Sequence, residues 1–450
     1  MNKKLPDEGN MKRILYGVVI MGLVFGSGSG SHDIISSQET VTVSRNILVS
    51  HPGSVRPEEV VICINPKNPN NLVAGANLDF FYHSMDGGFT WTEGRLSSPL
   101  GVWGDPCVIA DDEGNFYYGH LSNPVEGEWI DRIVVQKSTD GGATWNQGAG
   151  IGLNPPKDQD KEWLAADITD SPYRNNLYAA WTEFDRYGSD DPEDRTRILA
   201  ARSIDSGVHW SDPVVVSDVT GNCLDSDETV EGAVPAVGPK GEIYLCWAGP
   251  LGLTFDKSLD GGQTFGEDIP VTPLPGGWDI DVAGIYRCNG MPITACDISD
   301  SPYRGHIYIL WSDQRNGVGD TDVFLVKSAD GGKTWGSVTR VNDDPPGRQQ
   351  FFPWMTIDQK TGYIYAVFYD RRDSTDYSTE IYLARSDDGG RTFTNHKISD
   401  YPFNPVSGIF FGDYIGIAAD GGMIYPIWAR MDGVDLSIWT AVVTDGAARR

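Results

Sequence analysis

Five acidic residues stand just before, or at the start of, apolar segments that are spread along the whole chain. They are Glu59, Asp105, Glu162, Glu231 and Asp413. If these apolar segments gather around one axis, their acidic ends gather too. Two carboxyl groups at a suitable separation are the usual machinery of glycoside hydrolysis. The residue types therefore indicate a glycan-cleaving site.

Arginines that follow aromatic segments add a means of holding an anion. The segments read WTEFDR, WSDQRNG, FYDRRD and WARMDG, and they contain Arg186, Arg315, Arg371, Arg372 and Arg430. Arginine offers a planar fork of donors to a carboxylate or a sulfate. We expect Arg186 and Arg372 to pair with neighbouring aspartates. Arg315, Arg371 and Arg430, together with Glu162, are then the candidate substrate-binding residues.

The element that must position these residues is a short turn that occurs six times. Each copy reads Ser-x-Asp-x-Gly-x-x-aromatic, as in SMDGGFTW at residues 84–91. The Ser and Asp side chains bond backbone N–H groups of a tight turn, and the glycine takes a positive φ without strain. The copies recur at roughly 54–70-residue intervals, which is typical of a propeller or a solenoid. Their aspartates, which we expect to be structural, are Asp86, Asp140, Asp205, Asp260, Asp330 and Asp388.

This turn is the Asp-box, and the chain from residue 39 onward resembles the sialidase-like β-propeller superfamily. The resemblance implies an all-β fold of four-stranded antiparallel blades. Sialidases use a tyrosine nucleophile assisted by a carboxylate, and an acidic residue as general acid. By resemblance, Asp105 is the candidate acid, and Asp413, Tyr414 and Glu231 complete the candidate catalytic set. Arg56 precedes the first blade, where sialidases carry an arginine that binds the substrate carboxylate.

Neighbouring residues of a strand face opposite sides. If Asp413 faces the central channel, Tyr414 belongs to the core and its catalytic partner is another acid such as Glu231. The resemblance also implies that the aspartates of the six turns lie on the opposite face of the propeller from this site.

The strand pattern predicts seven blades, with six as the alternative that sialidases proper follow. In blade 2 the expected strands are residues 106–110, 116–119, 133–137 and 144–145. After the sixth turn motif come three further strands, so a seventh blade lacks its fourth strand. Residues 39–50, ETVTVSRNILVS, alternate like a strand. We expect this segment to complete the last blade and to close the ring.

The N-terminus has the pattern of an export signal. A basic start at Met11 is followed by the apolar run 14–26 and by small residues. We therefore expect a signal peptide over residues 1–30, with Met11 as a possible start, a linker over 31–38 and one propeller domain over 39–450. The protein is expected to be secreted or periplasmic, without a membrane anchor. In such a compartment some cysteines could pair, for instance Cys288 with Cys296 or Cys223 with Cys246. For Cys63 and Cys107 the alternative is that they are buried strand thiols.

A net charge of −28 argues against nucleic acid as a partner. The partner we expect is a carbohydrate, and the oligomeric state is left open. No cofactor is expected, although the acidic ring could hold Ca²⁺. The first function is an exported hydrolase of an acidic glycan, containing sialic or uronic acid. The alternatives are a non-catalytic glycan- or protein-binding propeller and a polysaccharide lyase that uses His120.

Overall fold

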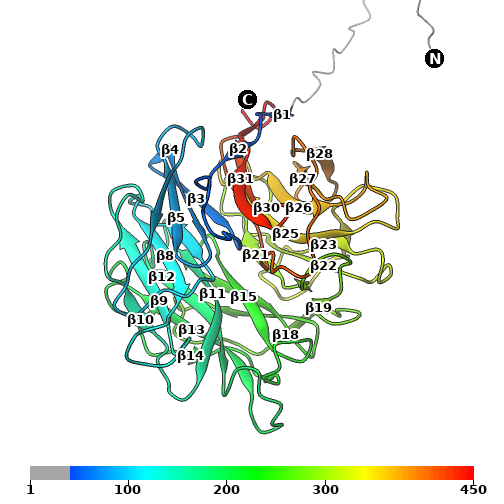
Figure 1. Ribbon diagram of the computed structural model, residues 1–450. Helices are drawn as coiled ribbons and strands as arrows, with labels where there is room; N and C mark the ends of the chain where they lie inside the picture. The colour runs from blue at the N-terminus through cyan, green and yellow to red at the C-terminus, as the bar shows by residue number, and fades with distance from the viewer. Residues whose placement is uncertain (1–40, 450) are drawn as a thin grey trace, which may run out of the picture. The chain divides into compact units, whose positions relative to one another are not determined.

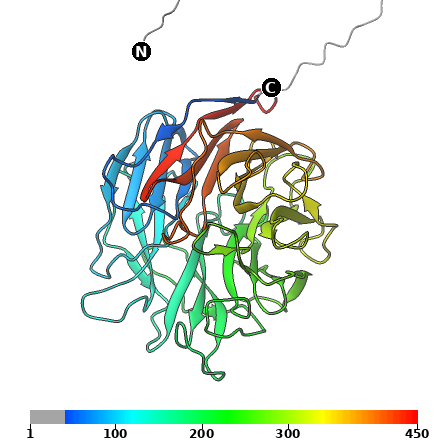
Figure 2. The same cartoon turned by 45° about the vertical axis from the view of Figure 1, so that its right-hand side comes forward.

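The computed structural model describes residues 41–449, which form seven antiparallel sheets arranged as the blades of a propeller (Figures 1 and 2). Six sheets have four strands each, and the seventh carries two additional short strands. The prediction of seven blades is confirmed, and the alternative of six is wrong. The predicted signal peptide and linker lie outside the described residues. Between residues 41 and 449 no helix has the length and apolarity needed to cross a membrane.

The innermost strand of each blade lines the central channel. These strands are β3 (Val61–Asn65), β7 (Cys107–Ala110), β11 (Asp158–Ala166), β15 (Glu231–Val237), β21 (Ile293–Cys296), β25 (Gln350–Ile357) and β29 (Gly416–Asp420). Each contacts the next, and the last contacts the first, so they form a closed ring. The second strands are β4 (Asn68–Ala76), β8 (Phe116–Leu121), β12 (Leu177–Phe184), β16 (Ile243–Ala248), β22 (Ile307–Asp313), β26 (Ile364–Asp370) and β30 (Met423–Asp432).

The outer half of each blade holds the third and fourth strands. The third strands are β5 (Phe80–Ser84), β9 (Ile133–Ser138), β13 (Thr196–Ser203), β17 (Leu253–Ser258), β23 (Asp322–Ser328), β27 (Glu380–Ser386) and β31 (Asp435–Thr440). The fourth strands of the first six blades are β6 (Thr92–Arg95), β10 (Ala149–Ile151), β14 (Val214–Val215), β18 (Ile269–Thr272), β24 (Thr339–Arg340) and β28 (Thr394–Lys397). A short hairpin, β19 (Asp279–Ile280) with β20 (Cys288–Asn289), lies between blades 4 and 5.

The seventh blade takes strands from both ends of the chain (Figure 1). β2 (Ile47–Leu48) pairs with β31, and β1 (Val41–Val43) pairs with β32 (Val443–Asp445). β32 in turn pairs with the start of β30. The residues 39–50 predicted for this place thus include two short strands rather than one. Closure of the ring by this segment stays a prediction that deletion can test.

The Asp-box is a closed set of local hydrogen bonds, as blade 2 shows. Ser138 donates to Asp140 at 2.8 Å and accepts from the Gly142 amide at 3.0 Å. The Thr144 amide and hydroxyl both donate to Asp140, at 2.9 and 2.6 Å. Thr144 is therefore part of the turn. The fourth strand predicted at residues 144–145 was wrong, and it begins at Ala149.

The core lies between neighbouring blades and is rich in aromatic residues. Four tryptophans of second strands are fully buried: Trp181, Trp247, Trp311 and Trp428. The cysteines take part in this packing as free thiols. The possible pairs Cys223–Cys246 and Cys288–Cys296 are not formed, and Cys288 and Cys296 lie in different sheets.

Candidate functional site

The inner strands of blades 3, 4 and 6 share an irregularity at the end where they enter the channel. The pairing with the second strand shifts between Asp160 and Trp163, between Glu231 and Val234, and between Phe351 and Trp354. Each shift contains a residue of positive φ, which in blade 3 is Lys161 with φ 51°. A bulge turns a side chain away from the alternation of the strand. It brings the Lys161 side chain among the acids at the channel mouth.

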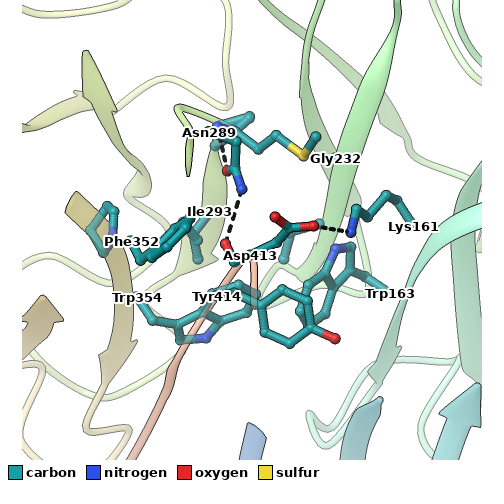
Figure 3. Close-up of a pocket in the computed structure, with 13 residues that line it drawn as sticks. Lys161, Trp163, Gly232, Asn289, Ile293, Phe352, Trp354, Asp413 and Tyr414 are labelled. Atoms are coloured by element: carbon teal, nitrogen blue, oxygen red, sulfur yellow. Dashed lines mark hydrogen bonds and ion pairs between the residues drawn. The ribbon is translucent and has the colours of Figure 1, made fainter. Parts of the chain in front are cut away.

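Lys161 joins acids from three different blades. Its ammonium donates to Asp413 at 2.8 Å (Figure 3). It also donates to Asp105 at 3.1 Å and lies 3.8 Å from Glu59. The Lys161 side chain is only 6 % exposed. Asn289 donates to the Asp413 backbone carbonyl at 3.0 Å and fixes the loop that carries this acid. We call Lys161, Glu59, Asp105 and Asp413 the lysine cluster.

A second cation extends the lysine cluster toward solvent. Arg287, from the β19–β20 hairpin, donates through Nε to Asp413 at 2.9 Å and through Nη2 to the other oxygen of the same carboxylate. Its Nη1 lies 3.5 Å from Asp225, which also accepts a hydrogen bond from the Tyr187 hydroxyl at 2.5 Å. The Arg287 side chain is 41 % exposed, so it borders the opening of the mouth.

The protonation states of these acids are driven in opposite directions. Burial alone would raise the pKa of Asp413, but the charges of Lys161 and Arg287 outweigh it and hold that pKa below its usual range. Burial, and then the charge of Asp105, raises the pKa of Asp160 to about 7. Burial, followed by the charges of Asp225 and Asp160, raises the pKa of Glu231 well above its usual range. The mouth therefore holds ionised and protonated carboxyl groups side by side.

The structure brings Asp105 and Asp413 together through Lys161, as the sequence predicts for residues at one mouth. Glu231 and Glu162 are buried, and burial raises the pKa of both. The negative charge of Asp105 adds to the shift of Glu162. These two acids are therefore buried beneath the surface of the mouth.

Tyr414 lies below Lys161 and closes the channel. Burial, and then the charges of Glu59 and Asp105, raise the pKa of Tyr414 well above its usual range. Its hydroxyl donates to the Pro106 carbonyl at 3.3 Å. Its ring lies 5.0 Å from that of Trp163 and 6.0 Å from that of Trp354, and these two tryptophans are 4.5 Å apart (Figure 3). The three rings form an aromatic plug below Lys161. Between the plug and the lysine cluster is a cavity of about 30 Å³, which is room for about one water.

The arginines predicted to bind substrate occupy separate places. Arg315 is held by Asp313, with bonds of 2.6–2.9 Å, and Arg430 is held by Asp432 at 2.9–3.1 Å. Arg56 is exposed beside a groove between the N-terminal segment and the seventh blade. None of these three has a hydrogen bond to the lysine cluster among the described residues. Arg372 pairs with Asp370 at 2.8 Å, as expected.

Arg371 is buried without a carboxylate partner among residues 41–449. It donates to the Ala283 carbonyl at 2.6 Å, to Gln349 at 2.8 Å and to Thr379 at 3.1 Å, and its Nη2 has no hydrogen bond there. Burial lowers its pKa to about 10.

His120, the base of the lyase alternative, is fully buried and bonded to the Leu121 carbonyl and Gln136. Burial lowers its pKa to about 4. A histidine enclosed in this way cannot reach a substrate, so the structure gives no support to the lyase. In the described part of the chain no three His, Cys, Asp or Glu side chains are grouped to hold a metal ion.

Sequence reasoning missed Lys161, Arg287, Asp160 and Asp225 as residues of the mouth. Lys161 stands two residues before the first channel residue of β11, Trp163, just as Asp105 stands two before Cys107. A comparison of these offsets would have found it. Arg287 lies in a hairpin that no other blade repeats, so no internal pattern pointed to it.

A scan against models of protein families found no match, and a search of curated proteins found none either. Solved structures do resemble the chain. A protein of unknown function from Dyadobacter fermentans is 12 % identical and has a TM-score of 0.51, with 90 % of this chain and 99 % of the other covered.

The shared fold is a β-propeller. Two enzymes are also similar to the chain in structure. An α-L-arabinofuranosidase from Fusarium graminearum is 14 % identical, with a TM-score of 0.49 and 90 % and 98 % of the two chains covered. The NanB sialidase from Streptococcus pneumoniae is 8 % identical, with a TM-score of 0.48 and 84 % of each chain covered. At these identities the likeness is one of fold alone, and the chain is not close in sequence to the sialidases proper.

Proposed function

We propose that this sialidase-like propeller is a glycoside hydrolase that works at the channel mouth. The observation that carries the proposal is a set of carboxyl groups at one mouth, of which Asp413 has a lowered pKa and Asp160 a raised one. Asp105 receives a hydrogen bond from the Lys161 ammonium at 3.1 Å, which holds its carboxyl group at the mouth. Asp160 has a pKa raised to about 7, so it carries a proton under mildly acidic conditions. Carboxyl groups whose environments separate their pKa values are suited to the roles of base and acid.

We assign the proton donor to Asp160 and the base or nucleophile to Asp105, which sequence reasoning had favoured as the acid. Asp413 supports the pair by holding Lys161 and Arg287 in place. Glu231 lies buried next to them, and burial raises its pKa. Tyr414 is a wall residue in this proposal, because its hydroxyl bonds a backbone carbonyl.

The sequence favoured an acidic sugar as the substrate, and the charges at the mouth favour an uncharged one. Arg315 and Arg430 are neutralised by their own aspartates, and the acids at the mouth outnumber Lys161 and Arg287. A substrate carboxylate would meet a negative field there. A substrate screen should therefore also contain sialosides and uronides, so that acidic and uncharged sugars are compared directly.

The test is a screen of chromogenic glycosides and polysaccharides with wild-type protein, Asp105→Asn and Asp160→Asn. A matched control is Glu126→Gln, an exposed acid in the β8–β9 loop on the same face. Each of the first two changes should lower kcat by about 10²–10⁴-fold, the usual contribution of a proton-transferring group. Glu126→Gln should leave kcat unchanged.

The pH profile gives an independent readout. Activity requires protonated Asp160, so it should be present below pH 7 and fall as the pH rises through about 7. Full activity of Asp160→Asn, or no turnover across the whole screen, would refute the hydrolase. Glycan or protein binding without turnover would favour the non-catalytic propeller instead. Export is part of the same proposal, and it is tested by locating the processed chain in the periplasm or the medium.

A further inference from the structure

A row of three aromatic rings lies beside the mouth, outside the acids described above. Trp103 precedes β7, Trp129 lies in the β8–β9 loop and Tyr187 lies in the β12–β13 loop. The ring centres of Trp103 and Trp129 are 6.5 Å apart, and those of Trp129 and Tyr187 are 5.6 Å apart. Trp103 is 38 % exposed and Trp129 is 43 % exposed. Large aromatic surfaces of this kind are costly to leave in water and mark a binding surface.

The row is rigid, because each ring is fixed by its neighbours. Both contacts of Trp129 are edge-to-face, with interplanar angles of 89° and 90°. The Tyr187 amide donates to Asp158 at 2.7 Å, and its ring packs 4.9 Å from that of buried Phe184. A surface held in one arrangement loses little entropy when a ligand binds.

The row is continuous with the proposed catalytic mouth. The Tyr187 hydroxyl donates to Asp225 at 2.5 Å, and Asp225 lies 3.5 Å from Arg287, which holds Asp413. A ligand that contacts the aromatic row and also reaches Asp225 is therefore at the edge of the lysine cluster. The row comes from blades 2 and 3, which also supply Asp105, Asp160 and Lys161.

The chemistry of the row fits a sugar chain better than other ligands. The C–H face of a sugar ring is attracted to the electron-rich face of an aromatic ring. Its hydroxyl groups can donate to carboxylates such as those of Asp158 and Asp225. Nucleic acid bases also stack on aromatic rings, but the acids around the mouth would repel the phosphates. The same repulsion disfavours a glycan that carries carboxylates.

We propose that Trp103, Trp129 and Tyr187 form a subsite for uncharged sugar residues of an extended glycan, beyond the residue that occupies the mouth. The location of the cleaved bond rests on the proposed function, whereas binding at the row does not. The protein then recognises a chain of several sugars and not a single terminal residue.

The test is affinity electrophoresis of the full chain in gels that contain one polysaccharide each. The neutral probes are arabinan, xylan, galactomannan and starch, and the anionic probes are polygalacturonate and polysialic acid. Wild-type protein should be retarded by at least one neutral probe and by neither anionic probe. Trp129→Ala and Trp103→Ala should each weaken that retention by about tenfold, the scale of one lost aromatic contact.

The matched control is Phe89→Ala, which removes a 57 % exposed aromatic ring in the Asp-box of blade 1. It should bind as the wild type does. Trp129→Phe keeps an aromatic face and should retain most of the binding, which separates stacking from a loss of local structure. Near-ultraviolet circular dichroism confirms that each variant is folded.

The outcomes for the row and for the hydrolase are distinguishable. Asp160→Asn should lose turnover and keep its retention in the gel. Retention without any turnover refutes the hydrolase and leaves the subsite standing. Turnover of a polymer with the same KM in Trp129→Ala as in the wild type refutes the subsite and leaves the hydrolase standing. Failure of every neutral probe to retard the wild type, or retardation by the anionic probes alone, also overturns the subsite.

Discussion

Lys161→Met removes the charge at the centre of the lysine cluster and keeps the length of the side chain. The ammonium donates to Asp413 at 2.8 Å and to Asp105 at 3.1 Å. Removing one partner of a buried ion pair costs about 3–5 kcal/mol, because the other charges are left uncompensated. We expect the lower end of this range, since Asp413 keeps Arg287. For a compact unit of about 410 residues the unfolding entropy is about 0.9 kcal/mol per kelvin. The expected fall in Tm at pH 7 is therefore about 3–4 °C.

The size of this effect should depend on pH. The lowered pKa of Asp413 contributes stability that is present above the unfolded value of about 4 and is lost as the pH falls through the folded value. Without Lys161 the folded pKa of Asp413 rises, and that of Glu59, already raised by burial, rises further. These carboxyl groups then take up protons at higher pH in the variant. The difference in Tm between variant and wild type should shrink between pH 7 and pH 5.

The assay is differential scanning calorimetry at both pH values, with Lys360→Met as the matched control. Lys360 pairs with Asp420 at 2.6 Å, but its side chain is 59 % exposed, so the expected cost is below about 1 kcal/mol, or about 1 °C. A Lys161→Met protein within 1 °C of the wild type at pH 7 would show that the cluster does not need its lysine. A difference that widens on acidification would refute the electrostatic reasoning.

Three further changes test the scaffold and the arginines. Asp140→Ala removes the acceptor of the Thr144 hydrogen bonds and should lower the free energy of unfolding by about 1–2 kcal/mol. The kcat should not change, because this turn lies on the face away from the mouth. Unfolding and activity assays on one sample check both effects. Deletion of residues 41–50 exposes the edge of β31 and should cause aggregation, which light scattering detects; a soluble monomer with a modest loss of Tm would contradict closure of the ring by this segment. Arg371→Met replaces a buried cation whose hydrogen-bond partners among the described residues are all neutral, so Tm should stay the same or rise. A loss of several degrees would show that the free energy of its hydrogen bonds exceeds the cost of burying its charge.

The turns and the blade number could be predicted because the information is local. Each Asp-box closes its hydrogen bonds within a few residues, as Ser138, Asp140 and Thr144 do. Its chemistry is therefore visible in a short stretch of sequence. The inner strand of blade 2, predicted over residues 106–110, is Cys107–Ala110, since an apolar run next to a turn leaves little choice of register.

The arrangement of the mouth was less predictable, because it depends on departures from strand alternation. The bulge in β11 points Lys161 toward Asp413 and leaves Glu162 buried, and a strict period of two would not give this. Arg315 and Arg430 were taken as free to bind an anion, although an aspartate stands two residues away from each. That spacing was a readable signal. Arg287 depends on a hairpin whose position only the folded chain reveals.

The aromatic plug blocks the channel below Lys161, so the space next to Lys161 opens only toward the mouth. Trp163 and Trp354 line both the small cavity next to Lys161 and a larger one of about 180 Å³ on the side of the Asp-boxes, so they are the wall between the two. A molecule that reaches Lys161 must therefore leave through the opening by which it entered. In a hydrolase with such a site, product and substrate use the same entrance, and accumulated product inhibits turnover by occupying it.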